Sequence, residues 1–423
     1  MTVADATAAV APGPPARFVG NRRSYWRLLI RGAVLLAVSL GIYRFWYATD
    51  VRRFLWSNTE VAGETLEYTG TALELLIGFL IAIALLVPLY LGFAVAALSL
   101  GPIGQLISAL SVPLLFVLGQ FAIYRARRYR LTRTVYRGVR CHQGGSAVRY
   151  AICASFWWVL IVLTLGLAYP FAQSRLERFK MRNTYYGNLQ GRFEGSGVRL
   201  FLRGLPMWFF VAGPIAFALQ FSISTVEWDK VIAAGAASGG GTDFVNQLET
   251  AFPDVYSAIV IWIAALSISV VMVALLFPAF QAMMLRWWIG GLRLETLTVR
   301  SELHTGAIYA AYLRFLWYGI VFAFALVILG ALSLAGVYGA LTQSDRSDLI
   351  EIATAAIGLM TYVTAMLGFS AIYQGTVKFA LWRCGVESIW LQGASILERV
   401  NAQGTPSSAV GEGLADALNV GGF

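Results

Sequence analysis

The stretch LLIGFLIAIALLVPLYLGFAVAALSLGPIGQLISALSVPLLFVLGQFAIY, from Leu75 to Tyr124, contains no Asp, Glu, Lys or Arg, and RARRYRLTRTVYRGVR, from Arg125 to Arg140, follows it directly. The apolar part is long enough for two helices across a bilayer, because one crossing needs about 20 residues. The basic part after it marks a return to the cytosolic side. This pair of helices, out and back, is the unit from which the rest of the fold can be predicted.

The rest of the chain has the same character. Of its 423 residues, 58% are hydrophobic and 13% are charged, whereas soluble domains have about 45–50% apolar and about 25% charged residues. Four more long stretches lack Asp, Glu, Lys and Arg, at 205–226, 255–285, 315–342 and 352–377. The sequence therefore predicts an all-α integral membrane protein with six spanning helices in three hairpins.

Two further apolar segments, 32–43 and 151–174, are harder to place. The first has only 12 residues, too few to span, and Gly166 and Pro170 interrupt the second. Each segment either crosses the membrane or enters it and returns to the same side.

The basic residues distinguish the two arrangements, because Lys and Arg in short loops mark the cytosolic face. If both short segments return, 30 of the 32 Lys and Arg lie on one side; if both cross, only 19 do. We therefore predict two re-entrant or interfacial helices and both termini in the cytosol. Re-entrant backbone needs polar partners, so these helices should lie inside the bundle. Eight crossing segments remain the alternative, because the charge rule has exceptions.

An internal repeat surrounds the two short segments. Shifting the chain by 125 residues without a gap places 40–80 over 165–205 with nine identical positions. Each repeat holds a re-entrant helix, a basic elbow, two spans and a basic loop. The predicted parts are a cytosolic N-terminal tail (1–26), repeat 1 (27–149), repeat 2 (150–314), a third hairpin with a basic end (315–397) and a disordered tail (398–423).

The elbows and the basic loop after the second span carry the candidate site residues. Arg beside aromatic rings is typical of the membrane interface, and clustered Arg at a cytosolic helix end attracts anionic lipid. These residues fit a pair of symmetric headgroup or ligand sites, but an anchored, capped elbow without a ligand is the favoured explanation, because Trp, Tyr and Arg are ordinary at an interface. The candidate lipid- or ligand-binding residues are Arg44, Arg52, Arg53, Asn58, Thr59, Tyr68, Arg127, Arg128, Arg130, Arg175, Arg178, Asn183, Thr184 and Phe193.

The sequence gives no sign of catalysis, a metal or a cofactor. The six clear spans contain no ionisable Asp, Glu, Lys, Arg or His, which disfavours a proton-coupled transporter. The two histidines have no partner at metal-ligand spacing, and the three cysteines lack a C-x-x-C pattern. Lipid phosphates are at hand for the basic loop, so nucleic acid is not an expected partner.

Several motifs resemble those of a known family. They include LGIYRFW (Leu40 to Trp46), RRFLWSNT (Arg52 to Thr59), EYTGT (Glu67 to Thr71) and FPAFQ (Phe277 to Gln281). The chain is similar to the YjgN-type family of bacterial inner-membrane proteins over most of its length. The resemblance implies a multi-pass location in a bacterial cytoplasmic membrane and no established activity.

Together these patterns predict a non-enzymatic protein whose elbows bind anionic lipid headgroups, for lipid handling or envelope organisation. The alternative is a passive channel or small-solute transporter whose path is lined by the two re-entrant segments.

Overall fold

The computed structural model describes residues 16–238, 253–341, 347–403 and Asp416. Most of these residues are helical, and six helical stretches are long and apolar enough to cross a membrane. The prediction of a helical membrane protein with six candidate spans is thus confirmed in its main part. The six stretches are Ala72–Ser99, Gly101–Thr132, Gly197–Thr225, Pro253–Gly291, Thr305–Ala340 and Asp348–Glu387.

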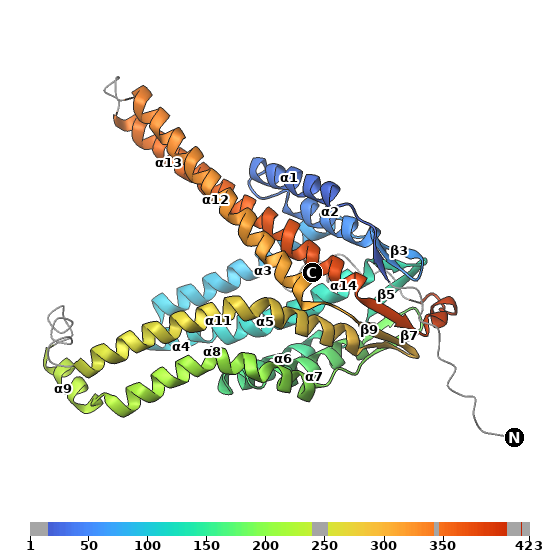
Figure 1. The fold of residues 1–423 in the computed structure, drawn as a ribbon, viewed down its shortest axis with the longest axis horizontal. Coiled ribbons are helices and arrows are strands. Elements are labelled where there is room, and N and C mark those ends of the chain that lie inside the picture. Colours follow the sequence, from blue (N-terminus) through green and yellow to red (C-terminus); the bar gives the residue numbers. More distant parts are fainter. Residues whose placement is uncertain (1–15, 239–252, 342–346, 404–415, 417–423) are drawn as a thin grey trace.

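The long helices form three pairs that leave a β-sheet at one end of the molecule and return to it (Figure 1). The apolar flanks of these helices are exposed, as at Phe324 and Val327, which is the pattern expected of a surface that faces lipid. The first pair is α3 (Ala72–Ser99) with α4 (Gly101–Ala109) and α5 (Ser111–Thr132). The second is α8 (Gly197–Thr225) with α11 (Pro253–Gly291), and the short helix α9 (Trp228–Ser238) follows α8. The third is α12 (Thr305–Leu341) with α13 (Ser347–Tyr373), a π-helical turn (Gln374–Lys378) and α14 (Phe379–Glu387).

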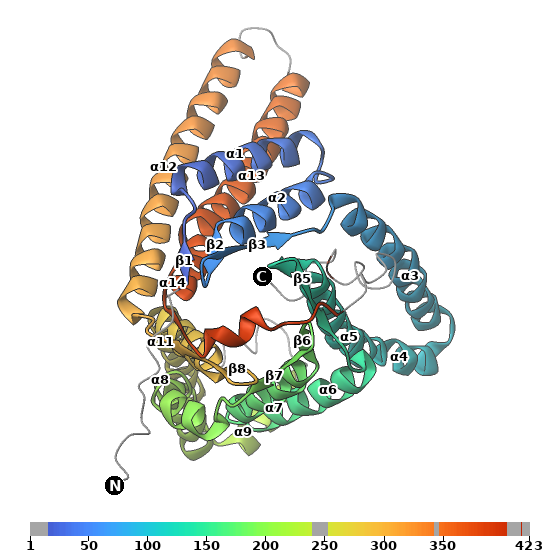
Figure 2. The same cartoon turned by 90° about the vertical axis from the view of Figure 1, so that its right-hand side faces the viewer.

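The two short apolar segments form helical hairpins. Helix α1 (Arg22–Val38) turns into α2 (Arg44–Ser57), and α6 (Ala147–Leu163) turns into α7 (Tyr169–Arg182). The turns use a left-handed Leu-Gly pair, with φ of 49° and 93° at Leu40 and Gly41, and of 50° and 92° at Leu165 and Gly166. Each hairpin begins and ends beside the sheet, so the chain returns to the side from which it came (Figure 2).

The prediction that these segments lie inside the bundle is wrong. The tips of both hairpins are exposed, with 94% of Leu40 and 78% of Leu165 accessible. Each turn satisfies the N–H of its own glycine: Gly41 N donates to Leu36 O (2.9 Å) and Gly166 N to Ile161 O (2.7 Å).

A ten-stranded antiparallel sheet joins all the helical parts, and the all-helical prediction did not include it. Four hairpins have the same plan, a three-residue strand, a two-residue turn and a five-residue strand. They are β2 (Thr59–Val61) with β3 (Glu64–Tyr68), β4 (Thr134–Tyr136) with β5 (Val139–Gln143), β6 (Thr184–Tyr186) with β7 (Leu189–Phe193), and β8 (Leu292–Leu294) with β9 (Leu297–Ser301). The outer strands are β1 (Arg17–Phe18), paired with β2, and β10 (Ile389–Gln392), paired with β9.

The two edges of the sheet meet. The backbone N–H of Ala16 donates to Ile389 O at 3.2 Å, so the strands form a ring. The segment after β10, which includes the 3-10 helix Ala394–Glu398, runs inside the ring (Figure 2). Its side chains and those of the hairpins form one hydrophobic core. Buried members of this core include Tyr136, Tyr186 and Leu397. The C-terminal part of the chain therefore fills the centre of the ring.

Three helices, α3, α6 and α8, begin a few residues after a β-hairpin, and a Ser or Thr side chain caps the start of each. Thr71, Ser146 and Ser196 each accept a hydrogen bond from the backbone N–H three residues later, at 3.3–3.4 Å. Such N-caps satisfy donors that the first helical turn leaves without partners.

Part of the predicted disordered tail can be placed. Within 398–403, the backbone N–H of Asn401 donates to Asn188 Oδ1 at 3.0 Å. Asp416 is buried. The remaining tail residues lie outside the described part of the chain.

Candidate functional site

Most of the predicted elbow residues hold the elbow itself together. Arg53 Nη2 donates to Gly70 O at 3.0 Å, and Arg178 Nη2 donates to Gly195 O at 3.3 Å, the same contact 125 residues later. The Asn and Thr candidates cap the helix that precedes them. Asn58 and Asn183 donate to carbonyls four residues back at 2.7 Å, and the hydroxyls of Thr59 and Thr184 do so at 2.7 and 2.8 Å.

Four further candidates lie apart from one another. Arg44 lies over the ring of Phe79, 4.4 Å from its centroid, and Arg128 Nη2 donates to Gly144 O at 2.9 Å. Arg175 is exposed on α7, and the buried ring of Phe193 packs edge-on against another aromatic ring. The structure gives these residues no common site.

The last four candidates lie near a carboxylate that sequence reasoning missed. Two of them contact it, the third contacts one of these two, and the fourth lies beside a different carboxylate. Arg52 binds Asp416 with both terminal nitrogens, with Nη2 at 3.2 Å from Oδ1. Arg130 Nε lies 3.6 Å from the same oxygen, and Arg52 Nη1 also donates to Tyr68 OH at 3.2 Å. Only 2% of the Asp416 side chain is exposed. The fourth candidate, Arg127, lies three residues before Arg130 and therefore on the same face of α5.

A second carboxylate, Glu177, completes the arrangement. It accepts from Lys180 and from Trp288 Nε1 (3.1 Å), and Arg127 Nη1 lies 3.9 Å away. We call Arg52, Arg127, Arg130 and Lys180 with Glu177 and Asp416 the cation cluster.

The charged side chains of the cation cluster are held away from water. Among the described residues it contains four cations and two carboxylates, and all six side chains are less than a fifth exposed. Burial lowers the pKa of Lys180, although Glu177 beside it acts in the opposite direction. Burial also acts to lower the pKa of Arg52, but the Asp416 carboxylate and Tyr68 raise it above its usual value.

A cavity of about 740 Å³ adjoins the cluster at Glu177. Helices α7, α11 and α14 and the strands β2 and β3 enclose it. Its walls are largely apolar, and polar groups enter at a few points. These polar and aromatic lining residues include Gln173, Glu177, Gln281, Lys378, Trp287, Trp288 and Trp382.

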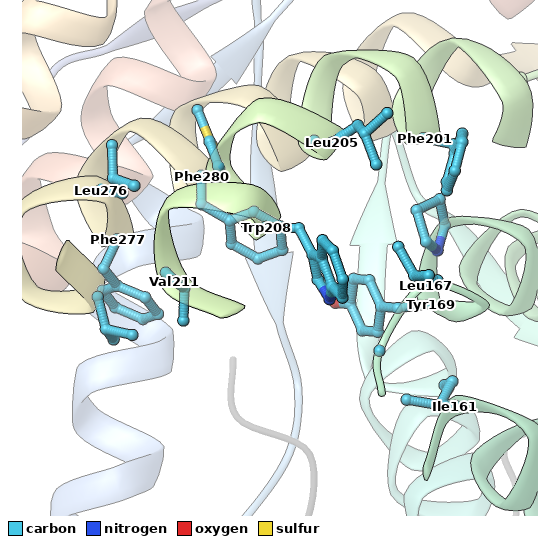
Figure 3. A pocket seen from close by; sticks show the side chains of 15 residues that line it. Ile161, Leu167, Tyr169, Phe201, Leu205, Trp208, Val211, Leu276, Phe277 and Phe280 are labelled. Atoms are coloured by element: carbon cyan, nitrogen blue, oxygen red, sulfur yellow. The ribbon is translucent and has the colours of Figure 1, made fainter. Parts of the chain in front are cut away.

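An apolar groove of about 430 Å³ continues from this cavity between the α6–α7 turn, α8 and α11 (Figure 3). Groove and cavity share the side chains of Tyr169, Phe277 and Phe280. Trp208 fixes one wall, because its Nε1 donates to Leu165 O at 2.8 Å. Groove and cavity thus adjoin each other, and the cavity meets the cation cluster at the Glu177 carboxylate, which is held by Arg127 and Lys180.

Comparison with protein families gives one match. Residues 14–417 match the family model described as "Bacterial protein of unknown function (DUF898)". The chain belongs to this family. The assignment agrees with the resemblance to the YjgN-type family that the motifs indicated. Searches of curated proteins and of solved structures each found no match.

The description of the DUF898 family assigns no activity, so its function has to be argued from the site. Within the described part of the chain, no group of three or more His, Cys, Asp or Glu could hold a metal ion. The arrangement can bind an amphiphile: its aromatic and aliphatic walls suit an apolar chain, and its Arg and Lys side chains suit an anionic group.

Proposed function

We propose that this protein is a non-enzymatic protein of the bacterial inner membrane that binds an anionic amphiphile, a phospholipid in the simplest case. The apolar chain lies in the groove and cavity, and the anionic group faces Lys378 and the cation cluster. The observation that carries the proposal is the continuity of the site: three aromatic side chains join groove to cavity, and Glu177 joins cavity to cluster.

The proposed orientation places the sheet in the cytosol. The helix pairs and the short hairpins all start and end at the sheet, which carries the basic segments between them. The described chain near Ala16 and near Asn401 also lies at the sheet. A cytosolic sheet satisfies the charge rule and puts both termini in the cytosol.

The amphiphile proposal differs from the predicted headgroup-binding elbows in where the ligand lies. Arg53, Arg178 and the Asn-Thr pairs already use their polar groups within the elbow. The cation cluster, in contrast, adjoins a cavity at Glu177, and Lys378 lines the same cavity. We therefore move the proposed anionic contact from the elbow surface to the cluster.

The passive channel is less well supported. The centre of the ring is filled by the core around Leu397 and Tyr186, which blocks a direct path through the sheet. The tips of the short helical hairpins are exposed on the outside of the bundle and line no path between them. An amphiphile that enters sideways from the bilayer needs no such path.

Gly204 offers a direct test. It lines the groove from α8, and a Cβ added there meets only Met283 Cε, at an ordinary contact distance of 3.8 Å. The Gly204→Leu variant should therefore fold and fill the groove. Gly213→Leu is a matched control on the same helix, since a Cβ there meets no described atom within 4 Å and Gly213 does not line the groove.

The measurement is the amount of lipid that co-purifies with each protein in mild detergent, quantified by mass spectrometry. We expect Gly204→Leu to lose most of the anionic lipid bound by the wild type and Gly213→Leu to retain it. Equal lipid content in the wild type and both variants would refute binding in the groove.

A further inference from the structure

A polar cavity of about 370 Å³ lies between the two helices of the first helical hairpin, α1 and α2. The helices run side by side (Figure 1, Figure 2). Gly32 on α1 allows this close approach, because a Cβ added there would lie 2.1 Å from Tyr47 Cδ2 on α2. We call this space the interhelical cavity. Its charged and polar lining side chains include Ser24, Arg27, Arg31, Tyr43, Asp50 and Arg53.

Three guanidinium groups and one carboxylate line the interhelical cavity, and most of their hydrogen-bonding groups are unused. Arg27 and Arg31 lie four residues apart, so they share one face of α1. In the part of the chain that the structure describes, neither side chain forms a hydrogen bond or an ion pair. Arg53 donates from Nη2 to Gly70 O at 3.0 Å. Asp50 forms no ion pair with any of these three described arginines, so the cavity holds cationic and anionic groups apart from one another.

The second helical hairpin shows that a hairpin of this kind does not need these charges. Helices α1 and α6 have 17 residues each and begin 125 residues apart. At this offset Ile152 stands in place of Arg27, and Phe156 stands in place of Arg31. Both apolar side chains are exposed. The arginines of the first hairpin therefore serve something other than the formation of the hairpin.

We propose that the interhelical cavity binds a phosphate ester that also carries an ammonium group, as the phosphoethanolamine headgroup of a phospholipid does. The planar N–H forks of Arg27, Arg31 and Arg53 match phosphate oxygens. The Asp50 carboxylate accepts hydrogen bonds from the ammonium group of the same ligand. A ligand with phosphate alone would leave Asp50 beside a charge of its own sign, which opposes binding.

In the proposed orientation, the interhelical cavity lies at the depth of the lipid headgroups. Arg27 and Arg53 lie toward the ends of α1 and α2 that meet the sheet. The opposite end of the hairpin is apolar and exposed at Val38, Leu40 and Ile42. An apolar tip among the acyl chains places the arginines at its base beside lipid phosphates.

The interhelical cavity is separate from the amphiphile site of the proposed function. It shares no lining residue with the groove or with the cavity of about 740 Å³. The same chemistry fits a lipid headgroup and a free phosphate ester such as O-phosphoethanolamine. Only the lipid source rests on the proposed orientation, because the free compound tests the cavity without any acyl chain.

The experiment measures ligand binding to the full chain in maltoside micelles by titration calorimetry. The probes are dihexanoyl phosphatidylethanolamine, dihexanoyl phosphatidylcholine and free O-phosphoethanolamine. The choline lipid keeps the phosphate and the positive charge but has no N–H donor for Asp50. We expect the wild type to bind the ethanolamine lipid about fivefold more tightly than the choline lipid. Tighter binding of the ethanolamine lipid than of O-phosphoethanolamine assigns the ligand to the bilayer, and equal binding assigns it to a free phosphate ester.

Two variants separate the phosphate contact from the ammonium contact. Arg27→Gln combined with Arg31→Gln should weaken binding of all three probes at least about tenfold, because hydrogen bonds to a charged group are lost. Asp50→Asn should weaken binding of the two ethanolamine probes only and remove the preference over choline. Arg149→Gln is the matched control and should bind as the wild type does. It changes an exposed arginine in the first turn of α6 that does not line the interhelical cavity.

Equal binding of the two lipids by the wild type, or unchanged binding by the double arginine variant, overturns the proposal. If the double variant does not fold, Arg31→Lys keeps the charge and removes the planar fork, and it should still weaken binding. Unchanged affinity of Arg31→Lys also overturns the proposal.

The failure of this site and the failure of the groove can be distinguished. The lipid titrations are repeated in the Gly204→Leu background, in which the groove is filled. An Asp50→Asn effect that disappears in that background belongs to the groove and overturns binding between α1 and α2. Loss of the Gly204→Leu effect on bound lipid removes the amphiphile from the groove and leaves the O-phosphoethanolamine measurement intact.

Discussion

Arg52 and Glu177 occupy the same position, the ninth residue, in the 14-residue helices α2 and α7, and they carry opposite charges. Both are linked to α5: Arg52 shares Asp416 with Arg130, and Glu177 lies beside Arg127. The cation Lys180 of α7 is thus neutralised by Glu177 of the same helix. The cation Arg52 of α2 is instead neutralised by Asp416, which is 364 residues away in the sequence.

Removal of Glu177 should strongly destabilise the protein. In Glu177→Ala, the buried Arg127 and Lys180 lose their carboxylate, and breaking a buried ion pair from one side costs about 3–5 kcal/mol. Thermal unfolding in detergent checks this, with Glu387→Ala as an exposed control expected to change stability by less than about 1 kcal/mol. Similar stability of the two variants would show that Glu177 is not a significant counter-ion.

A glycine should be required at position 166 because of its left-handed backbone conformation, and not because a larger side chain would clash with its neighbours. Its φ is +92°, and a Cβ there would meet only Trp208, at 3.8 Å or more. Gly166→Ala should therefore destabilise the α6–α7 turn by about 1–2 kcal/mol. Gly213→Ala, inside α8, should instead stabilise the protein by about 0.5–1 kcal/mol. The measurement is the thermal unfolding midpoint of each variant. If both midpoints shift in the same direction relative to the wild type, this explanation is contradicted.

Stability should fall as the pH is lowered through the range in which histidine titrates. His142 stacks on Tyr185 with ring centroids 5.0 Å apart, and burial lowers its pKa below the ordinary value. The unfolded chain then takes up a proton at a higher pH than the folded protein, so stability present above about pH 6.5 is lost as the pH falls. His142→Phe should show a smaller decrease in melting temperature between pH 7.5 and 5.5 than the wild type; an unchanged decrease would exclude His142 as its source.

The proposed orientation can be checked with single cysteines in a background without the three native ones. Glu64, at the start of β3, and Ser224, near the end of α8, are both exposed and lie toward opposite ends of the molecule. A membrane-impermeant thiol reagent added to cells with a permeable outer membrane should label Ser224→Cys at once. It should label Glu64→Cys only after the inner membrane is opened, and the reverse order would invert the proposed topology.

The spans could be predicted from sequence because each needs only a long run without charge, a signal that is local. The sheet could not be predicted, because its strands are two to five residues long and carry charged residues such as Glu64 and Arg140. None of its two-residue turns is the Asn-Gly or Asp-Gly pair that marks a hairpin most strongly; the first is Ala62-Gly63. Asn58 and Asn183, candidate binding residues in the sequence, bond to the helix before them, and the strand that follows each was missed.

The candidate site could be predicted only in part. The repeat and the basic run pointed to Arg52, Arg130 and Tyr68, which lie together at Asp416, and to Arg127, which lies beside Glu177. Asp416 could not be found, because no local pattern links it to residues more than 280 positions away. The change from Arg52 to Glu177 at matching repeat positions was visible in the sequence, and it was the one available signal that the two elbows have different electrostatic roles.

Closure of the ring through Ala16 and Ile389 has a consequence for biogenesis. The first strand to leave the ribosome cannot complete its pairing until nearly the whole polypeptide has been synthesised. Until then Ala16 and β9 are open strand edges, and such edges are prone to pairing with other chains. Closure of the ring therefore follows synthesis of all six candidate spans, and nascent chains that terminate before Ile389 should be substrates for quality-control proteases.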